Sequence, residues 1–126
     1  MKTKAMLAAA IAIGAAGCAA PQQSAVAPPP PLFCKVKDEC NLFWRRAQVW
    51  LAQNSSYRIQ SATDTVISTH GPRRYSVDRA YRITRVPGPN GTDQILFESG
   101  CANLFGCSTN RFDDEASFKR YVRGEP

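Results

Sequence analysis

Two pairs of cysteines with the same spacing limit the folds open to this chain. Cys34 and Cys40 lie six positions apart, and so do Cys101 and Cys107. This spacing fits a metal site, a redox pair or two covalent links, and the compartment of the protein decides among them. The first question is therefore where the chain resides.

The N-terminal segment has the pattern of an export signal. Lys2 and Lys4 precede an uncharged apolar run of twelve residues, 5–16. At about 1.5 Å per residue, a helix of this length cannot cross a hydrocarbon core of roughly 30 Å. A basic start followed by a short apolar run is typical of a secretory signal peptide. We therefore assign residues 1–17 to a signal peptide and exclude them from the fold.

Small residues lead directly to a cysteine at the end of this signal: Ala15, Ala16, Gly17 and Cys18. The stretch resembles the lipobox of bacterial lipoproteins, although Ala15 stands where leucine is usual. The resemblance implies diacylation of Cys18, with chains such as palmitate, and cleavage before it. Ala19, in place of aspartate, implies sorting to the outer membrane of a diderm bacterium. The alternative is an ordinary cleaved signal in which Cys18 is incidental.

The segment after the signal cannot form a hydrophobic core. Residues 18–33 are rich in alanine, glutamine and proline, with four consecutive prolines at 28–31. Such a stretch favours extended polyproline II, at about 3 Å per residue. We interpret it as a tether from the bilayer, since two acyl chains anchor a protein firmly without a transmembrane helix. Cleavage before Cys18 removes two lysines and no acidic residue, so the formal charge falls from +6 to +4.

In an exported protein the four remaining cysteines indicate disulfides. Zinc sites and redox pairs normally place two residues between their cysteines, a spacing absent here. Four cysteines allow three pairings, and sequence alone does not choose among them. We favour the local links Cys34–Cys40 and Cys101–Cys107, because each closes a short loop without a strand pattern and would contribute about 2 kcal/mol. Cross-links between the ends of the domain are the alternative.

The expected domain, residues 34–123, contains six segments with regular periodicity. Apolar residues recur at helical spacing over 38–54, where Asp38 is the expected N-cap, and again over 113–122. Asn90-Gly91 is a strong hairpin signal. The alternation typical of strands occurs in four segments between the helices: 57–62, 65–70, 75–86 and 94–99.

Four consecutive strands with short connections favour an antiparallel sheet, and the helices would cover one of its faces. We therefore expect a two-layer α+β domain with the order helix, four strands, helix. The amino-acid sequence of three segments, residues 50–69, 90–92 and 100–107, is similar to that of small lipoproteins of Gram-negative bacteria. The resemblance implies export and a single domain, and it implies no biochemical activity.

Few residues suggest catalysis or metal binding. His70 is the only histidine, and no nucleophile or orienting carboxylate stands at a recognisable spacing from it. The acidic run 113–115 suits a helix N-terminus better than a calcium site. Trp44 falls outside the main apolar stripe, so it is either core, which we favour, or a contact surface with Arg45. We expect no catalytic residue, no metal and no cofactor.

Five arginines fall within thirteen residues and form a candidate anion or partner surface: Arg73, Arg74, Arg79, Arg82 and Arg85. In an exported chain their partners would be anionic lipids, glycans or proteins rather than nucleic acid. On a strand, Arg79 and Arg85 face one side and Arg82 the other, so the five cannot form one flat patch on that strand alone. A solvated charged face is the alternative.

These features favour a non-enzymatic lipoprotein of the cell envelope. It would be anchored in the outer membrane through acylated Cys18, would face the periplasm, and would bind an envelope component or a protein partner. The alternative is a periplasmic inhibitor of a cell-wall hydrolase such as lysozyme. Lysozymes are commonly basic, so charge repulsion counts against that alternative. An enzyme would need a catalytic set that the sequence does not reveal.

Overall fold

The structure of the protein is a computed structural model that describes residues 17–18 and 27–126. All of the expected signal peptide except Gly17 lies outside the described residues, and so do residues 19–26 of the expected tether. Among the helices described, none combines the length and the apolar character needed to cross a bilayer.

Helix α1, Lys37–Asn54, forms where apolar residues recur at helical spacing. The prediction of Asp38 as its N-cap is wrong, because the N-cap position is Val36, whose side chain offers no acceptor. Asp38 and Glu39 lie instead in the first turn, where negative charge complements the helix dipole. The buried face of α1 consists of Cys40, Phe43, Trp44, Ala47, Trp50 and Leu51.

The sheet has five strands, so the prediction of four is wrong, whereas the α+β class and the antiparallel arrangement are confirmed. The strand order is β1-β5-β4-β3-β2, and all neighbours are antiparallel. The strands are β1 Leu32–Cys34, β2 Ile59–Ala62, β3 Val66–Thr69, β4 Ala80–Pro87 and β5 Asp93–Gly100.

The additional strand, β1, directly follows the four prolines. Three residues are too few to show an alternating pattern, and the neighbouring prolines suggested an extended tether. Leu32 nevertheless pairs with Ile95 of β5 and is buried, whereas Phe33 faces the opposite side of the sheet and is exposed. Leu32 and Phe33, which we had expected in the tether, therefore belong to the sheet.

The last prolines before β1 are held against helix α2, Arg111–Arg123. The Lys119 ammonium is buried, donates to the carbonyl of Pro30 at 2.7 Å, and pairs with Glu115 at 2.6 Å. A buried lysine needs such partners, because an unpaired ammonium away from water is costly. Residues 29 and 30 are thus part of the folded domain.

The strand expected over 75–86 begins only at Ala80. Tyr75 has φ of 62°, in the left-handed region, which interrupts an extended chain. At the other end of β4 the expected hairpin is confirmed: β4 and β5 are joined through the 3-10 turn Pro89–Gly91. Asn90 and Gly91 both have positive φ there, the conformation that these residue types tolerate best.

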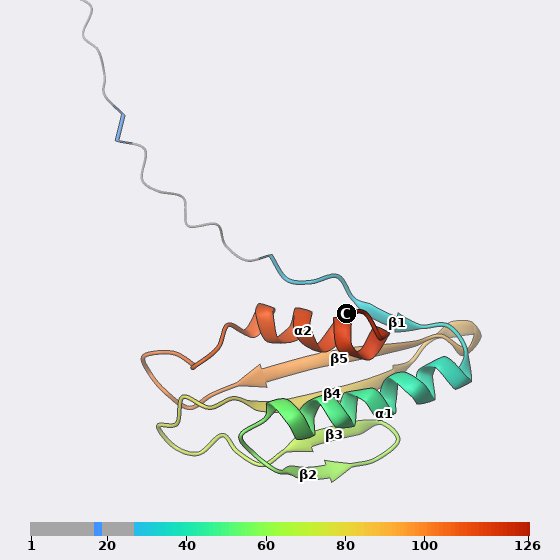
Figure 1. Cartoon of the computed structure of the whole chain (residues 1–126), viewed down its shortest axis with the longest axis horizontal. Helices are drawn as coiled ribbons and strands as arrows, with labels where there is room; N and C mark the ends of the chain where they lie inside the picture. Colours follow the sequence, from blue (N-terminus) through green and yellow to red (C-terminus); the bar gives the residue numbers. More distant parts are fainter. Residues whose placement is uncertain (1–16, 19–26) are drawn as a thin grey trace, which may run out of the picture.

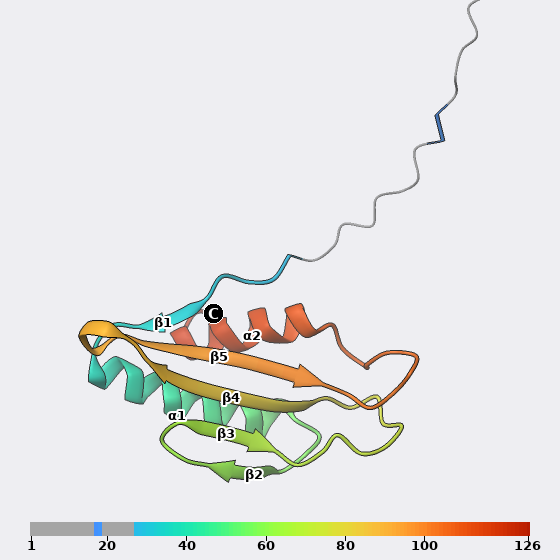
Figure 2. The same cartoon turned by 180° about the vertical axis from the view of Figure 1, so that it is seen from behind.

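Both helices lie on the same face of the sheet (Figure 1), and no described element covers the other face, as the reverse view shows (Figure 2). The core between the layers centres on Trp50. Its ring meets those of Tyr81, Phe97 and Phe118 edge-on, with centroids 5.4–5.8 Å apart. Trp44 is also core, as we favoured: it is buried, and its Nε1 donates to the Thr63 carbonyl at 2.9 Å.

Candidate functional site

The structure divides the five candidate arginines between two faces and a loop. Arg79 and Arg85 lie on the helix-covered side of the sheet. Arg79 donates to the carbonyl of Thr109 at 2.7 Å. Arg85 donates to Asp93 at 2.6 Å and to Asn41 at 3.2 Å. Because these two guanidinium groups are already paired and largely buried, they contribute little to an anion-binding surface.

The other three arginines are exposed. Arg82 points away from the helices near the start of β4, on the side opposite to Arg85, as strand alternation predicts. Arg73 and Arg74 belong to the loop before β4, where their guanidinium groups lie over the rings of Tyr57 and Tyr75. The structure therefore does not bring the five arginines together as one surface.

A different candidate surface is the uncovered face of the sheet, which sequence reasoning did not single out. The pairing register orders its residues in rows across the strands. At one end the face is apolar, with Phe33, Val86 and Leu96 exposed. At the other end Arg82 stands opposite Glu98 on β5 and Ser68 on β3. The face thus passes from apolar to charged along the strands.

The charged end of this face is hollowed. A shallow hollow of about 550 Å³ lies where β4 begins and β5 ends. Ala80 and Gly100 pair there, and the space stays open because alanine carries only a methyl group and glycine has no side chain. The polar groups around the hollow come from Gln60, Ser68, Arg82 and Glu98. Such a set of one cation, one anion, an amide and a hydroxyl can bind a polar ligand or the backbone and side chains of a peptide.

The apolar end carries a second hollow of about 370 Å³, lined by Phe33, Val86, Gln94 and the β4–β5 turn. An exposed aromatic beside a shallow apolar hollow is a common feature of protein contact surfaces. The sequence predicted the alternation of side chains along β4 and β5. It did not predict which of the two sides would stay uncovered, because that depends on where the two helices pack.

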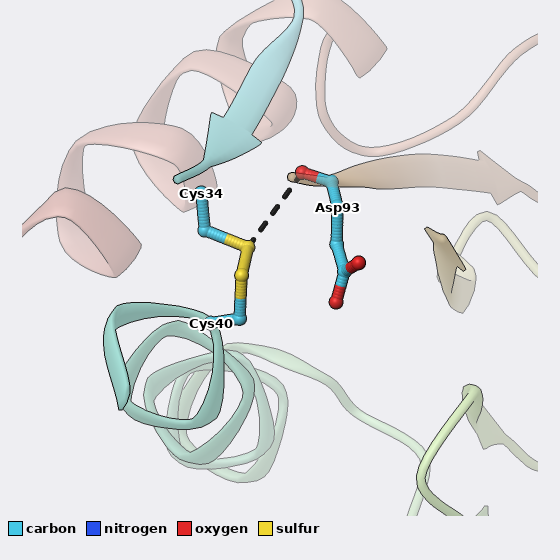
Figure 3. Close-up of side chains that lie close together, drawn as sticks. All are labelled: Cys34, Cys40 and Asp93. Atoms are coloured by element: carbon cyan, nitrogen blue, oxygen red, sulfur yellow. Dashed lines mark hydrogen bonds between the residues drawn. A yellow bond between two sulfur atoms is a disulfide. The ribbon is translucent and has the colours of Figure 1, made fainter. Parts of the chain in front are cut away.

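Cys34, Cys40 and Asp93 form the closest group of potential metal ligands among the described residues (Figure 3). The two sulfurs are joined in a disulfide, and the Asp93 carboxylate forms an ion pair with Arg85. Cys34 Sγ lies 3.6 Å from the Asp93 carbonyl oxygen, a packing contact, since a disulfide sulfur carries no proton to donate. In this state the group fastens β1 to α1 and β5 rather than holding an ion.

Both disulfides are the local ones that we favoured, Cys34–Cys40 and Cys101–Cys107. Cys18 is exposed and unpaired within the part of the chain that is described. His70 is exposed just after β3, and its ring makes no hydrogen bond to a described residue. These placements leave His70 without an orienting partner among the described side chains.

A partly buried polar network joins β4 to the start of α2. The Tyr81 hydroxyl donates to Asp114 at 3.1 Å, and Thr109 Oγ1 donates to the same carboxylate oxygen at 2.6 Å. Burial, followed by the negative charge of Asp114 and this hydrogen bond, raises the pKa of Tyr81 to about 12 from the usual 10.0. The network holds the N-terminus of α2 against the sheet.

The raised pKa of Tyr81 predicts a specific loss of stability at high pH. The stabilising contribution of the neutral hydroxyl is complete below pH 10.0 and is lost as the pH rises toward about 12. We expect wild type to be more stable than Tyr81→Phe at neutral pH, and this advantage to shrink by up to about 2 kcal/mol over that interval. Urea denaturation of both proteins across the pH range measures the difference. A difference that stays constant with pH would contradict the assignment.

Comparisons of the chain with family models, curated proteins and solved structures found no match. Its function must therefore be argued from the sequence and from the geometry of its own surface.

Proposed function

We propose that this protein is a non-enzymatic lipoprotein of the bacterial outer membrane. Cys18 is its lipid anchor, and the uncovered sheet face binds an envelope component or a protein partner in the periplasm. The uncovered face supports this binding role, because it has an apolar end around Phe33 and a charged hollow around Arg82 and Glu98. Antiparallel sheets with one solvated face usually carry polar residues there, so exposed Phe33 and Leu96 are unusual.

Two further features support export and anchoring. Both pairs of cysteines in the domain form disulfides, which persist in oxidising compartments. Cys18 is exposed and forms no disulfide with a described residue, so its thiol is available for acylation. Lys119 donates to the carbonyls of Pro29 and Pro30, so these prolines of the expected tether lie against the domain.

The anchor is tested by the mass and the N-terminus of the protein purified from membranes of a diderm host. We expect a chain that begins at Cys18 and carries lipid, and we expect Cys18→Ala to lose the lipid and leave the membrane fraction. A wild-type chain without lipid would contradict the anchor, whatever its domain binds.

The binding surface is tested by photo-cross-linking in intact cells, with a photoreactive side chain at Leu96 on the uncovered face. A matched control places it at Val49 on the outer side of α1, because the two positions are similarly exposed, at 39% and 43%. We expect one defined adduct from position 96, absent from position 49 and weakened by Arg82→Glu. Equal adducts from both positions, or none from either, would remove the uncovered face as the binding surface.

A further inference from the structure

The loop closed by Cys101–Cys107 carries the two most exposed apolar side chains of the described chain. Leu104 is 92% exposed and Phe105 is 100% exposed, and they are neighbours in sequence. The loop projects beyond the end of the sheet at which β5 ends and α2 begins, as both views show (Figures 1 and 2). Two adjacent large apolar side chains that are almost fully exposed indicate a surface that contacts another molecule.

This loop is held rigidly against the loop before β4. The Asn103 side chain donates to the carbonyl of Tyr75 at 2.8 Å and accepts from the backbone N–H of Phe105 at 2.9 Å. Ser108 N–H donates to the Val77 carbonyl at 2.9 Å. Together with the disulfide, these bonds constrain the loop backbone that carries the exposed apolar side chains before any partner is bound, so binding costs little backbone entropy.

The loop before β4 is also held in place where it begins, at residues 71–73. Gly71 lies so close to the Tyr57 ring that a Cβ would approach it to 2.9 Å, and its φ is +86°. The Tyr57 hydroxyl accepts from the backbone N–H of Arg73 at 3.0 Å. We call the resulting surface the apolar tip and define it by four exposed residues: Tyr75, Val77, Leu104 and Phe105.

Three exposed arginines lie in or next to the two loops of the apolar tip: Arg73 and Arg74 in the loop before β4, and Arg111 at the start of α2. The guanidinium groups of Arg73, Arg74 and Arg111 each lie over an aromatic ring, at 4.4–5.6 Å from its centroid. None of the three side chains forms an ion pair or donates a hydrogen bond to a described residue, so their N–H groups remain available. Asp78, the only acidic residue in the two loops, already accepts from Ser76 at 3.3 Å.

We propose that the apolar tip docks on an anionic phospholipid bilayer. Leu104 and Phe105 would enter the boundary between headgroups and acyl chains, while Arg73, Arg74 and Arg111 contact phosphates. A protruding apolar pair with unpaired cations in the adjoining segments matches a layer that is anionic outside and apolar beneath. The proposal rests on the lipid anchor of the proposed function, because tethering raises the local concentration enough for a weak contact to persist. The charged hollow adjoins the tip, because residues of both tip loops line it. The apolar end of the uncovered sheet face, around Phe33 and Val86, lies at the opposite end of the strands and stays accessible.

Docking is tested on the acylated protein reconstituted in vesicles of brominated phosphatidylcholine and phosphatidylglycerol. Tryptophan at position 105, from Phe105→Trp, reports contact with the brominated chains. The native Trp44 and Trp50 are buried and give a constant background. The control reporter is Val86→Trp, at the opposite end of β4 on the same domain and the same anchor. We expect strong quenching from position 105 and little from position 86.

The charge requirement is tested by Arg73→Gln with Arg74→Gln in the Phe105→Trp protein. The matched control is Arg45→Gln with Arg120→Gln, which removes the same charge from exposed helix positions. We expect the first pair, high salt or the omission of phosphatidylglycerol to reduce quenching, and the control pair to leave it unchanged. In the unacylated protein, Phe105→Ser should weaken partition into anionic vesicles by about tenfold, measured by co-sedimentation.

Equal quenching at positions 105 and 86 would overturn the docking proposal. So would a blue shift of the position-105 emission without quenching by brominated chains, since that places the tip against protein, for example a second copy of the chain. The mass of the purified protein reports separately whether Cys18 is acylated. If acylation fails, the proposed anchor is lost, while co-sedimentation of the unacylated protein still decides whether the tip binds lipid.

Discussion

Trp50→Ala is expected to destabilise the domain by about 3–5 kcal/mol, a large fraction of the 5–15 kcal/mol typical of small domains. Trp50 is buried at the centre of the layer between helices and sheet, where its ring contacts three other aromatic rings edge-on. The substitution loses that packing and leaves a cavity that neither the sheet nor α2 can fill without moving. Urea denaturation followed by far-UV circular dichroism gives the free energy of unfolding.

The control for Trp50→Ala is Val49→Ala, one position earlier on α1. Val49 is exposed, so its replacement should change the free energy of unfolding by no more than about 0.5 kcal/mol. Alanine is a better helix former than tryptophan or valine, so helix propensity cannot account for a loss of stability in either variant. Similar losses for the two substitutions would contradict the assignment of this stability to the aromatic core.

Asp93→Ala is expected to cost about 2–3 kcal/mol, because it leaves the Arg85 guanidinium largely buried with only Asn41 as a partner. Losing one partner of a fully buried pair costs about 3–5 kcal/mol, and we expect less here because both side chains are about 15% exposed. The free energy of unfolding measures the effect. Glu125→Ala, which removes the exposed partner of Arg123, serves as the control and should cost about 0–1 kcal/mol.

The double variant Arg85→Met, Asp93→Leu separates two explanations of that loss. If the cost of Asp93→Ala is that of an uncompensated charge, replacing both partners with apolar residues should recover most of the lost stability. If the double variant is as unstable as Asp93→Ala, the ion pair itself or the packing of Asp93 beside Cys34 is what stabilises this corner. Either result is read from the same denaturation curves.

Local sequence patterns predicted most of the secondary structure. Helical spacing located α1 and α2 to within a few residues, and Asn90-Gly91 located the β4–β5 hairpin. The errors arose where tertiary contacts override local pattern. β1 is a three-residue strand recognisable only through its pairing with β5. The strand expected from residue 75 begins at Ala80 because residues 71–79 pack as a loop against Tyr57 and the Cys101–Cys107 loop.

The candidate surfaces were harder to predict than the elements. Arginine spacing suggested a basic surface of five residues, but two of the five side chains are paired on the helix-covered side with Asp93, Asp114 and Thr109. Strand alternation correctly separated Arg82 from Arg85, since it depends only on neighbouring residues. The partners that neutralise Arg79 and Arg85 come from other elements, which no local pattern specifies.

The sequence by itself determined the α+β class, the antiparallel strand arrangement and most element positions, because periodicity and turn residues act over a few neighbouring positions. The four cysteines of the domain allow three disulfide pairings, and the sequence favoured the pairing with two local links, Cys34–Cys40 and Cys101–Cys107. Only the tertiary structure decided that Leu32–Cys34 adds a fifth strand, which side chains lie on the uncovered face, and that Leu104 and Phe105 project from a loop bonded to the loop before β4. These features depend on contacts between residues far apart in the chain, whose free energies are settled only when the whole domain packs.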